Sequence, residues 1–331
     1  MKFKFLLLFI LVCSAVMITT IILDKESYLV DVENQSLSTD GDNNISKGII
    51  PIKVNKKITI PYKITRKKNK AKVVKLDKES LKKITPRIAA LWNVKKGRGS
   101  YYRKVNVINK MGKNLSIQER HSLYEYVRSG PSENAYDLAA IDYVLIKLEN
   151  RKDIAEEFVN EMSNIVDDKN IDGSIRGYVM QHLGIAYDDK PEFRKSLKET
   201  YYTGLKDKST DVAGTSLMIL TNLSKRFNEF DKDLIKTAAI ELAADEDTQH
   251  ASRISVISKL GELQAKESLP SIRKQIKEGK GIVIKLAAIH SLGMLGEEKD
   301  IEVLEGFLAD SSEVIYNKAA SKALAILKNR I

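Results

Sequence analysis

The chain has 331 residues and a formal net charge of +11. It contains one cysteine, Cys13, and no pair of histidines at the spacing of helical zinc ligands, which argues against a disulfide framework and against a zinc site. The charge is unevenly distributed: residues 51–110 carry 20 basic and 2 acidic residues, whereas residues 111–331 carry 31 basic and 36 acidic residues. A basic segment therefore precedes a mildly acidic body.

The first 23 residues have the layout of an export signal. Lys2 and Lys4 precede an apolar run from Phe5 to Leu23, and acidic residues begin at Asp24. As a helix this run would be about 28 Å long, close to the thickness of a bilayer core. Residues 1–23 are therefore predicted to be a signal peptide or, through residues 5–23, a retained membrane anchor. The order of the charges predicts that the body lies outside the cytoplasm.

Residues 24–102 are predicted to be a largely unstructured linker, polar at first and then basic. Between Ile50 and Ile64 aliphatic and polar residues alternate, which favours one or two short strands, and Pro51 and Pro61 confine these to sheet edges. A basic cluster follows, made of Arg66, Lys67, Lys68 and Lys70. These side chains are candidate contacts for anionic lipid or envelope polyanions, whereas nucleic acid is disfavoured because aromatic residues are sparse. The alternative is a spacer with no binding role.

A box that begins with leucine recurs six times in residues 103–331. The clearest copies are Leu260-Gly261-Glu262-Leu263 and Leu292-Gly293-Met294-Leu295, and the others begin at Leu145, Leu183, Leu220 and Leu324. The leading leucines are 32 to 40 residues apart, which is the length of one helix-turn-helix unit. The pattern predicts an all-α fold: a right-handed α-solenoid of about six pairs of antiparallel helices. Because glycine inside a helix costs about 1 kcal/mol relative to alanine, its recurrence after the leucine indicates a steric need.

Helical spacing of apolar residues places the predicted pairs. They are 116–129 with 134–148, 153–165 with 171–186, 190–204 with 211–225, 230–243 with 248–263, and 268–277 with 280–295. A further first helix is predicted around Leu304, and residues 106–111 are predicted to begin an N-terminal cap.

These repeats resemble the HEAT-repeat family, particularly the bacterial short HEAT-like repeats that are also found in phycobilin lyases. The resemblance covers residues 103–331. It rests on Ile284-Lys285, Ala287-Ala288 and Leu292-Gly293-Met294-Leu295, and on Ile175-Arg176 followed by Leu183-Gly184. The family prefers a basic residue seven positions before the leading leucine. Arg176, Arg253 and Lys285 occupy that position, whereas Leu138, Ala213 and Asn317 depart from the preference.

Equivalent positions of stacked repeats form a column, so Arg176, Arg253 and Lys285 could form a basic ridge for an acidic ligand. The alternative is a structural ladder in which each cation pairs with a carboxylate from a neighbouring loop. The resemblance also implies that the second helices line a concave face, which adds His182, Lys259 and His290 as candidate contacts for a partner.

No arrangement of catalytic residues is recognisable. Residues 168–175 copy the start of a calcium-binding loop, but Val179 stands where the bidentate glutamate is needed, so a role in helix capping is favoured. The sequence predicts a non-enzymatic scaffold without a cofactor, exported or membrane-tethered, that binds another protein. Two alternatives stay open: a lyase or chaperone for a small prosthetic group, as the resemblance implies, and polyanion binding through residues 51–110.

Overall fold

The computed structural model describes residues 88, 91, 98–112, 114–129, 135–309 and 314–331, all of which belong to one compact unit, Lys75–Ile331. The predicted leader, the strands at 50–64 and the basic cluster lie outside the described residues. Within the described part of the chain, no helix combines the length and the apolar character needed to cross a bilayer.

The described residues form thirteen α-helices and no strand. The second helices of the pairs, and the helix that precedes them, carry even numbers: α4 (Arg98–Lys110), α6 (Ala135–Glu149), α8 (Gly173–Asp189), α10 (Asp211–Ser224), α12 (His250–Leu260), α14 (Ile282–Leu295) and α16 (Val314–Arg330). The first helices carry odd numbers: α5 (Ile117–Ser129), α7 (Ala155–Asp167), α9 (Arg194–Gly204), α11 (Lys232–Ala244), α13 (Leu269–Glu278) and α15 (Asp300–Ala309). Short 3-10 turns precede three of the first helices: Lys152–Ile154, Pro191–Phe193 and Lys266–Ser268. The predicted helix pairs are confirmed.

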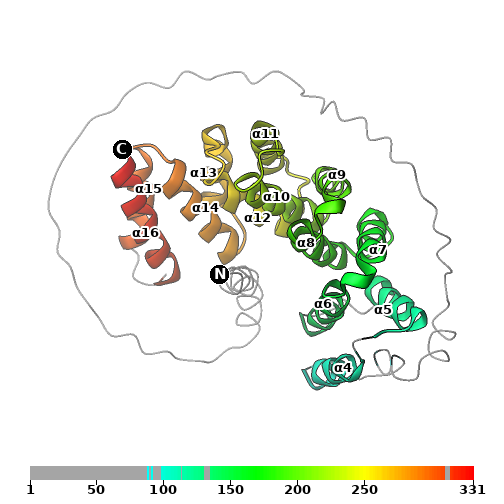
Figure 1. Cartoon of the computed structure of the whole chain (residues 1–331). Coiled ribbons are helices and arrows are strands. Elements are labelled where there is room, and N and C mark those ends of the chain that lie inside the picture. The colour runs from blue at the N-terminus through cyan, green and yellow to red at the C-terminus, as the bar shows by residue number, and fades with distance from the viewer. Residues whose placement is uncertain (1–87, 89–90, 92–97, 113, 130–134, 310–313) are drawn as a thin grey trace. The chain divides into compact units, whose positions relative to one another are not determined.

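The helices pack in two layers (Figure 1). Each even-numbered helix contacts the next even-numbered helix, from α4 through to α16, and each odd-numbered helix packs on its own partner. Among the odd-numbered helices, direct packing on the next one is substantial only between α7 and α9. The even-numbered layer is therefore the more tightly stacked of the two, as expected for the inner layer of a curved solenoid.

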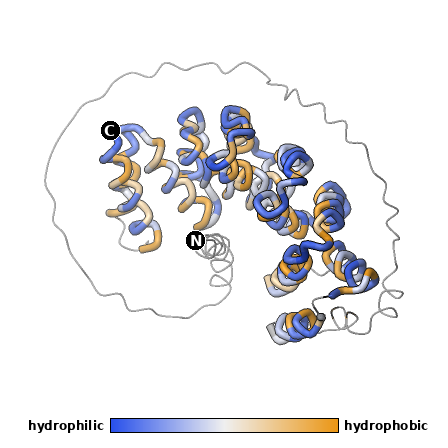
Figure 2. The backbone as a smooth tube through the Cα atoms, viewed as in Figure 1, coloured by the Kyte–Doolittle hydropathy of each residue, from blue (hydrophilic) through white to orange (hydrophobic). Residues whose placement is uncertain are grey.

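The leucine boxes form the core between the layers. Leu145, Leu183, Leu220, Leu260 and Leu292 are fully buried, whereas Leu324 of the last helix is partly buried. Figure 2 shows the consequence along the chain, since most helices are hydrophobic on one side and hydrophilic on the other.

The glycines of the boxes lie where the next even-numbered helix makes its closest approach. A Cβ atom on Gly293 of α14 would lie 2.6 Å from Cα of Ala323 in α16, and one on Gly261 would lie 2.7 Å from Sδ of Met294. On Gly184 a Cβ would lie 2.9 Å from Cγ1 of Ile219. Real Cβ atoms do not come this close, so the predicted steric need for glycine is confirmed at these positions.

Two boundaries differ from the predictions. Helix α4 begins at Arg98, inside the predicted linker, and Ile88 and Leu91 further upstream are helical and buried. The sequence has an apolar run from Ile88 to Trp92, but the many basic residues on both sides of it favoured a linker. Helix α12 ends at Leu260, although the box continues to Leu263, because Gln264 adopts a left-handed φ of 52° and turns the chain toward the next repeat.

Candidate interaction surface

On each of the last two even-numbered helices, four of the residues that keep solvent exposure lie one helical turn apart. On α14 they are Val283, Ala287, His290 and Met294, and on α16 they are Ile315, Ala319, Lys322 and Ile326. We call these eight residues the inner stripe. Ile315 is 57% exposed and Ile326 is 41% exposed, which is unusual for large aliphatic side chains and leaves apolar area in contact with water.

His290 is the predicted candidate that lies on the inner stripe. It is exposed, and within the described part of the chain its side chain makes no hydrogen bond or ion pair. Lys285 of the same helix is half-buried and likewise makes no ion pair with a described residue. Both side chains are thus available to a partner.

Arg176 has a different environment, because it is buried and only 1% exposed. Its Nε donates to the carbonyl of Val166 at 2.8 Å, and its Nη2 donates to Asp207 in the loop before α10. Lys169 also donates to Asp207. Burial alone would raise the pKa of Asp207, but these donors outweigh it and hold that pKa below its usual value. The geometry of Arg176 favours the ladder over the ridge.

His182 is also buried and engaged between two helices. Its Nδ1 lies 2.5 Å from Oε2 of Glu149, and its Nε2 lies 3.0 Å from Oδ1 of Asp142, both on the preceding even-numbered helix, α6. Burial disfavours the charged imidazole, but hydrogen bonds to both carboxylates prevail and raise the pKa of His182 to about 9. At neutral pH His182 is therefore an imidazolium that joins α6 to α8.

Lys259 and a lysine of the preceding repeat share one carboxylate, that of Glu262. Nζ of Lys259 donates to Oε1 of Glu262 at 2.7 Å, and Lys225 of the preceding repeat donates to the other oxygen of the same carboxylate. Burial would raise the pKa of Glu262, yet the two lysines together lower it. Lys259 is only 13% exposed at its side chain, so its charge is largely committed within the array.

Arg253 is half-buried and lies beside a cleft of about 280 Å³ between α11, α12 and α13. Its Nη2 donates to the carbonyls of Asp245 at 3.1 Å and of Glu246 at 2.6 Å. Its Nε is buried and has no hydrogen-bond partner. Arg253 therefore differs from Arg176, although both stand seven residues before a box leucine.

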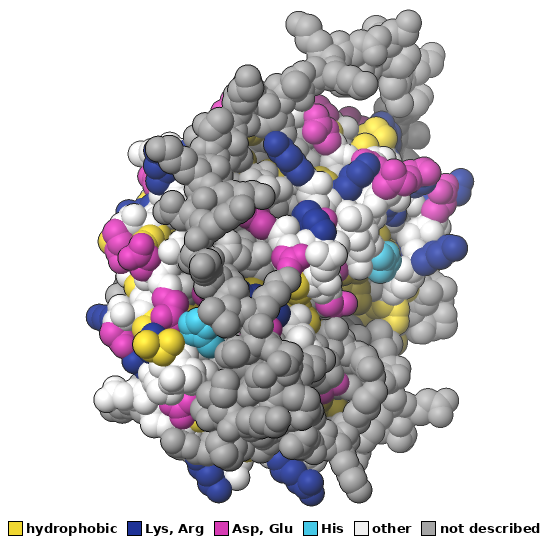
Figure 3. All heavy atoms as spheres, turned by 90° about the vertical axis from the view of Figure 1, so that its right-hand side faces the viewer, with side chains coloured by type: hydrophobic (Ala, Val, Ile, Leu, Met, Phe, Trp, Pro, Cys, Tyr) yellow, Lys and Arg dark blue, Asp and Glu magenta, His cyan; other side chains and the backbone are white. Residues whose placement is uncertain are grey.

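Charges of both signs are interspersed over the array. Figure 3 shows basic and acidic side chains alternating with hydrophobic ones on one side of the molecule. Many of these charges pair across neighbouring repeats: Arg120 with Glu157, Arg128 with Glu161, Lys208 with Asp245, Lys236 with Glu267, and Arg273 with Asp300. These pairs link neighbouring repeats to one another.

The calcium-like segment at 168–175 serves as a helix start. Oδ1 of Asp172 accepts from the backbone N–H of Ser174 at 2.9 Å and of Ile175 at 3.3 Å, which caps α8, and Asp168 accepts from Asn170. The described residues contain no group of three or more candidate metal ligands. Arg66, Lys67, Lys68 and Lys70 lie outside the described residues.

Sequence reasoning missed the acidic partners of the candidates. Asp207, Asp142 and Glu149 lie 31 to 40 residues from the cations that they bind. The repeat length was the available signal, because residues one repeat apart come side by side in a solenoid. Ile315 and Ile326 were also missed as exposed residues, since an aliphatic residue in a box helix is normally assigned to the core.

Residues 235–325 match the family model that describes HEAT repeats; this region spans α12 to α15 and most of α11 and α16. This part of the chain is built of HEAT repeats. The match does not distinguish the phycobilin-lyase subtype from other HEAT repeats. No curated protein matches the chain. HEAT repeats generally act as protein-interaction scaffolds.

Proposed function

We propose that this protein is a non-enzymatic scaffold that binds another protein through the inner stripe of α14 and α16. The observation that carries the proposal is the exposure of Ile315 and Ile326 on the inner stripe, where both aliphatic side chains are in contact with water. Buried apolar anchors dominate the energy of most protein interfaces, and a polar rim around them gives specificity. His290 and Lys322 supply unpaired polar groups next to these anchors.

The array also offers a matched control for this proposal. Val303 on α15 is 40% exposed, almost the same as Ile326, but it lies in the odd-numbered layer. A photoreactive phenylalanine analogue placed at position 326 of the full chain should crosslink to one protein in cells. The same group at position 303 should not crosslink to that protein.

Loss of the complex provides the second arm. Ile326→Asp should lower recovery of the crosslinked partner at least tenfold, because a hot-spot truncation costs about 2 kcal/mol or more. Val303→Asp should leave recovery within about twofold. Equal losses for the two variants, with both proteins folded by circular dichroism, would refute binding through the inner stripe.

We further propose that the array works outside the cytoplasm, tethered or released by residues 1–23. The support is the order of charges around the apolar run, with Lys2 and Lys4 before it and acidic residues after it. Ser321 is exposed on α16, so a Ser321→Cys variant can be labelled with a membrane-impermeant maleimide in intact cells. Labelling only after lysis would refute export.

A further inference from the structure

Arg176, the cation seven residues before the box leucine Leu183, has a structural acceptor in the next repeat. This acceptor is Asp207, which stands thirteen residues before the next box leucine, Leu220. Arg176 thus donates one hydrogen bond within its own repeat, to the carbonyl of Val166, and one to the next repeat, to the carboxylate of Asp207. One rung of the ladder therefore consists of a guanidinium, a carbonyl and a carboxylate.

The equivalent rung at Arg253 lacks the carboxylate. Arg253 bonds the carbonyls of its own repeat, but the position thirteen residues before Leu292 is Gly279. A Cβ atom on Gly279 would lie 2.3 Å from the carbonyl oxygen of Gln275, so no residue with a side chain fits there. Nη1 of Arg253 consequently has no partner among the described residues, and Nε is buried without one.

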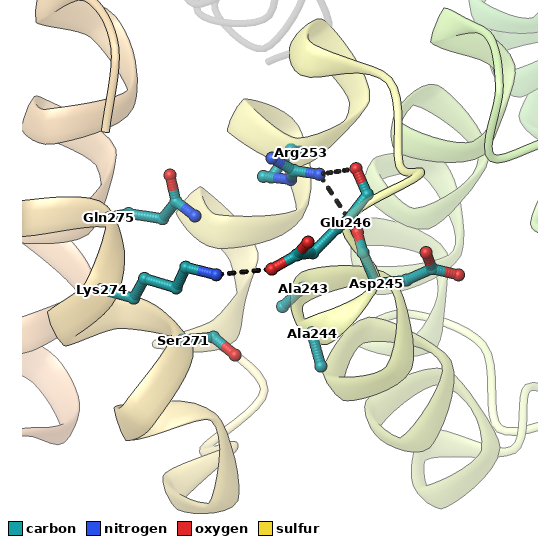
Figure 4. Close-up of a pocket in the computed structure, with 8 residues that line it drawn as sticks. All are labelled: Ala243, Ala244, Asp245, Glu246, Arg253, Ser271, Lys274 and Gln275. Atoms are coloured by element: carbon teal, nitrogen blue, oxygen red, sulfur yellow. Dashed lines mark hydrogen bonds and ion pairs between the residues drawn. The ribbon is translucent and has the colours of Figure 1, made fainter. Parts of the chain in front are cut away.

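The cleft opens beside the guanidinium of Arg253. Figure 4 shows Lys274 and Gln275 of α13 on one side, facing Arg253 and Glu246 on the other. Ser271 lies on the same wall as Lys274, and Ala243 and Ala244 complete the lining. The donors on these walls are an ammonium, a guanidinium, a hydroxyl and an amide, which together suit an oxygen anion.

The charge balance of the cleft also favours an anion. Asp245 is paired with Lys208 at 2.6 Å, and Glu246 is paired with Lys274 at 2.7 Å, so the guanidinium of Arg253 is the charge that lacks a carboxylate. The Glu246–Lys274 pair is exposed, with 81% and 51% of the two side chains accessible. Such surface pairs contribute little and exchange partners readily.

From this broken rung we infer that the cleft between α12 and α13 binds the carboxylate of an aspartate or glutamate on an acidic segment of the partner protein. The incoming carboxylate accepts from Nη1 of Arg253 and displaces Glu246 from Lys274. It thereby takes the role for Arg253 that Asp207 has for Arg176. The inference rests on the proposed protein-binding function and names the chemistry of one contact of the partner.

A carboxylate fits better than a phosphate because the array already uses carboxylates in both comparable places. Asp207 completes the rung at Arg176, and Glu246 occupies Lys274 in the free protein. A glutamate side chain also fits the volume of about 280 Å³ with room for water.

The test follows the Nε–H signal of Arg253 by nuclear magnetic resonance in the full chain, assigned by its absence in Arg253→Lys. The probe is acetyl-tetraglutamate amide, and acetyl-tetraglutamine amide is its uncharged counterpart. Reading the signal of Arg253 itself excludes binding elsewhere, including the basic residues 51–110. The acidic probe should shift the signal with saturation, and the uncharged probe should not.

Three variants decide the mechanism by the direction of their effects. Glu246→Gln removes the internal competitor and should lower the titration midpoint about threefold. Lys274→Gln removes a donor and should raise it about threefold or more. Arg226→Gln, a surface arginine paired with Asp188 in another repeat, should leave the midpoint unchanged.

Several outcomes would overturn the inference. One is no shift with the acidic probe, or an equal shift with the uncharged one. Another is a titration midpoint that is changed neither by Glu246→Gln nor by Lys274→Gln. If inorganic phosphate saturates the shift at a lower concentration than the acidic peptide does, the cleft binds a phosphate and the inferred carboxylate ligand is wrong. Failure here, with crosslinking through position 326 intact, would remove this contact and leave the proposed function standing.

Discussion

The two ends of the array solve the same packing problem with different chemistry. From α4 to α10, charged side chains are buried between repeats: Lys104, Glu119, Asp137, Arg176, His182, Lys190 and Asp207. From α11 to α16, Asp300 is the one charged residue that is buried among those described. There the repeats approach through small residues instead, with Gly293 against the backbone of Ala323.

The family match, residues 235–325, falls in the second of these two regions. Small residues at fixed positions form a pattern that recurs from repeat to repeat. Buried ion pairs are specific to one interface, because each requires a cation and a carboxylate at matched positions in two repeats. The N-terminal repeats therefore keep the fold while departing from the pattern.

The largest expected effect comes from a buried pair in the N-terminal region. Asp207→Ala leaves Arg176 buried with an uncompensated charge, which should cost about 3–5 kcal/mol in the free energy of unfolding. Urea unfolding followed by circular dichroism measures it. Asp188→Ala breaks an exposed pair with Arg226 and should cost less than about 1 kcal/mol. Similar costs for the two variants would contradict the contrast.

In the C-terminal region the sensitive position is a glycine. Gly293→Ala places a methyl group 2.6 Å from Cα of Ala323, and overpacking of this kind should cost about 1–3 kcal/mol. Gly306 of α15 is the control, since a Cβ there meets nothing within 4 Å. Gly306→Ala should instead stabilise the helix by up to about 1 kcal/mol. Thermal melts that shift the same way for both would refute the steric account.

The pH dependence of stability should report on His182. Its pKa is raised from 6.5 to about 9 in the folded chain, so its contribution is fully present below pH 6.5. That contribution is lost as the pH rises through about 9, because the neutral ring no longer donates to both Asp142 and Glu149. The melting temperature of the parent protein should fall over this range more than that of His182→Gln. Parallel curves would show that His182 does not titrate there.

The smallest expected effect is at Arg253. Arg253→Gln removes two hydrogen bonds to carbonyls but no salt bridge, and should cost at most about 1–2 kcal/mol. Arg176→Gln, at the equivalent position of an earlier repeat, should cost more because buried Asp207 would then lose its buried partner and keep only the exposed Lys169. Equal costs in urea unfolding would mean that the rung at Arg253 is complete.

The repeat fold was predictable because leucine boxes and helical spacing are local signals. The steric role of Gly261 and Gly293 followed from the same pattern. The environment of the candidates was less accessible: Arg176 and His182 look like surface cations in the sequence, but carboxylates one repeat away allow them to be buried. The helical residues before 103 were missed because the basic composition of residues 51–110 outweighed the short apolar run from Ile88 to Trp92.

The glycine contacts set the distance between consecutive even-numbered helices. In three of the six boxes the residue directly after the leucine is a glycine that faces the next even-numbered helix: Gly184 faces Ile219, Gly261 faces Met294 and Gly293 faces Ala323. In the other three boxes isoleucine, threonine or alanine stands at this position. The volume of this one side chain limits how near two consecutive helices can come. A single substitution per repeat is thus enough to change the local pitch of the inner layer while the leucine core is retained.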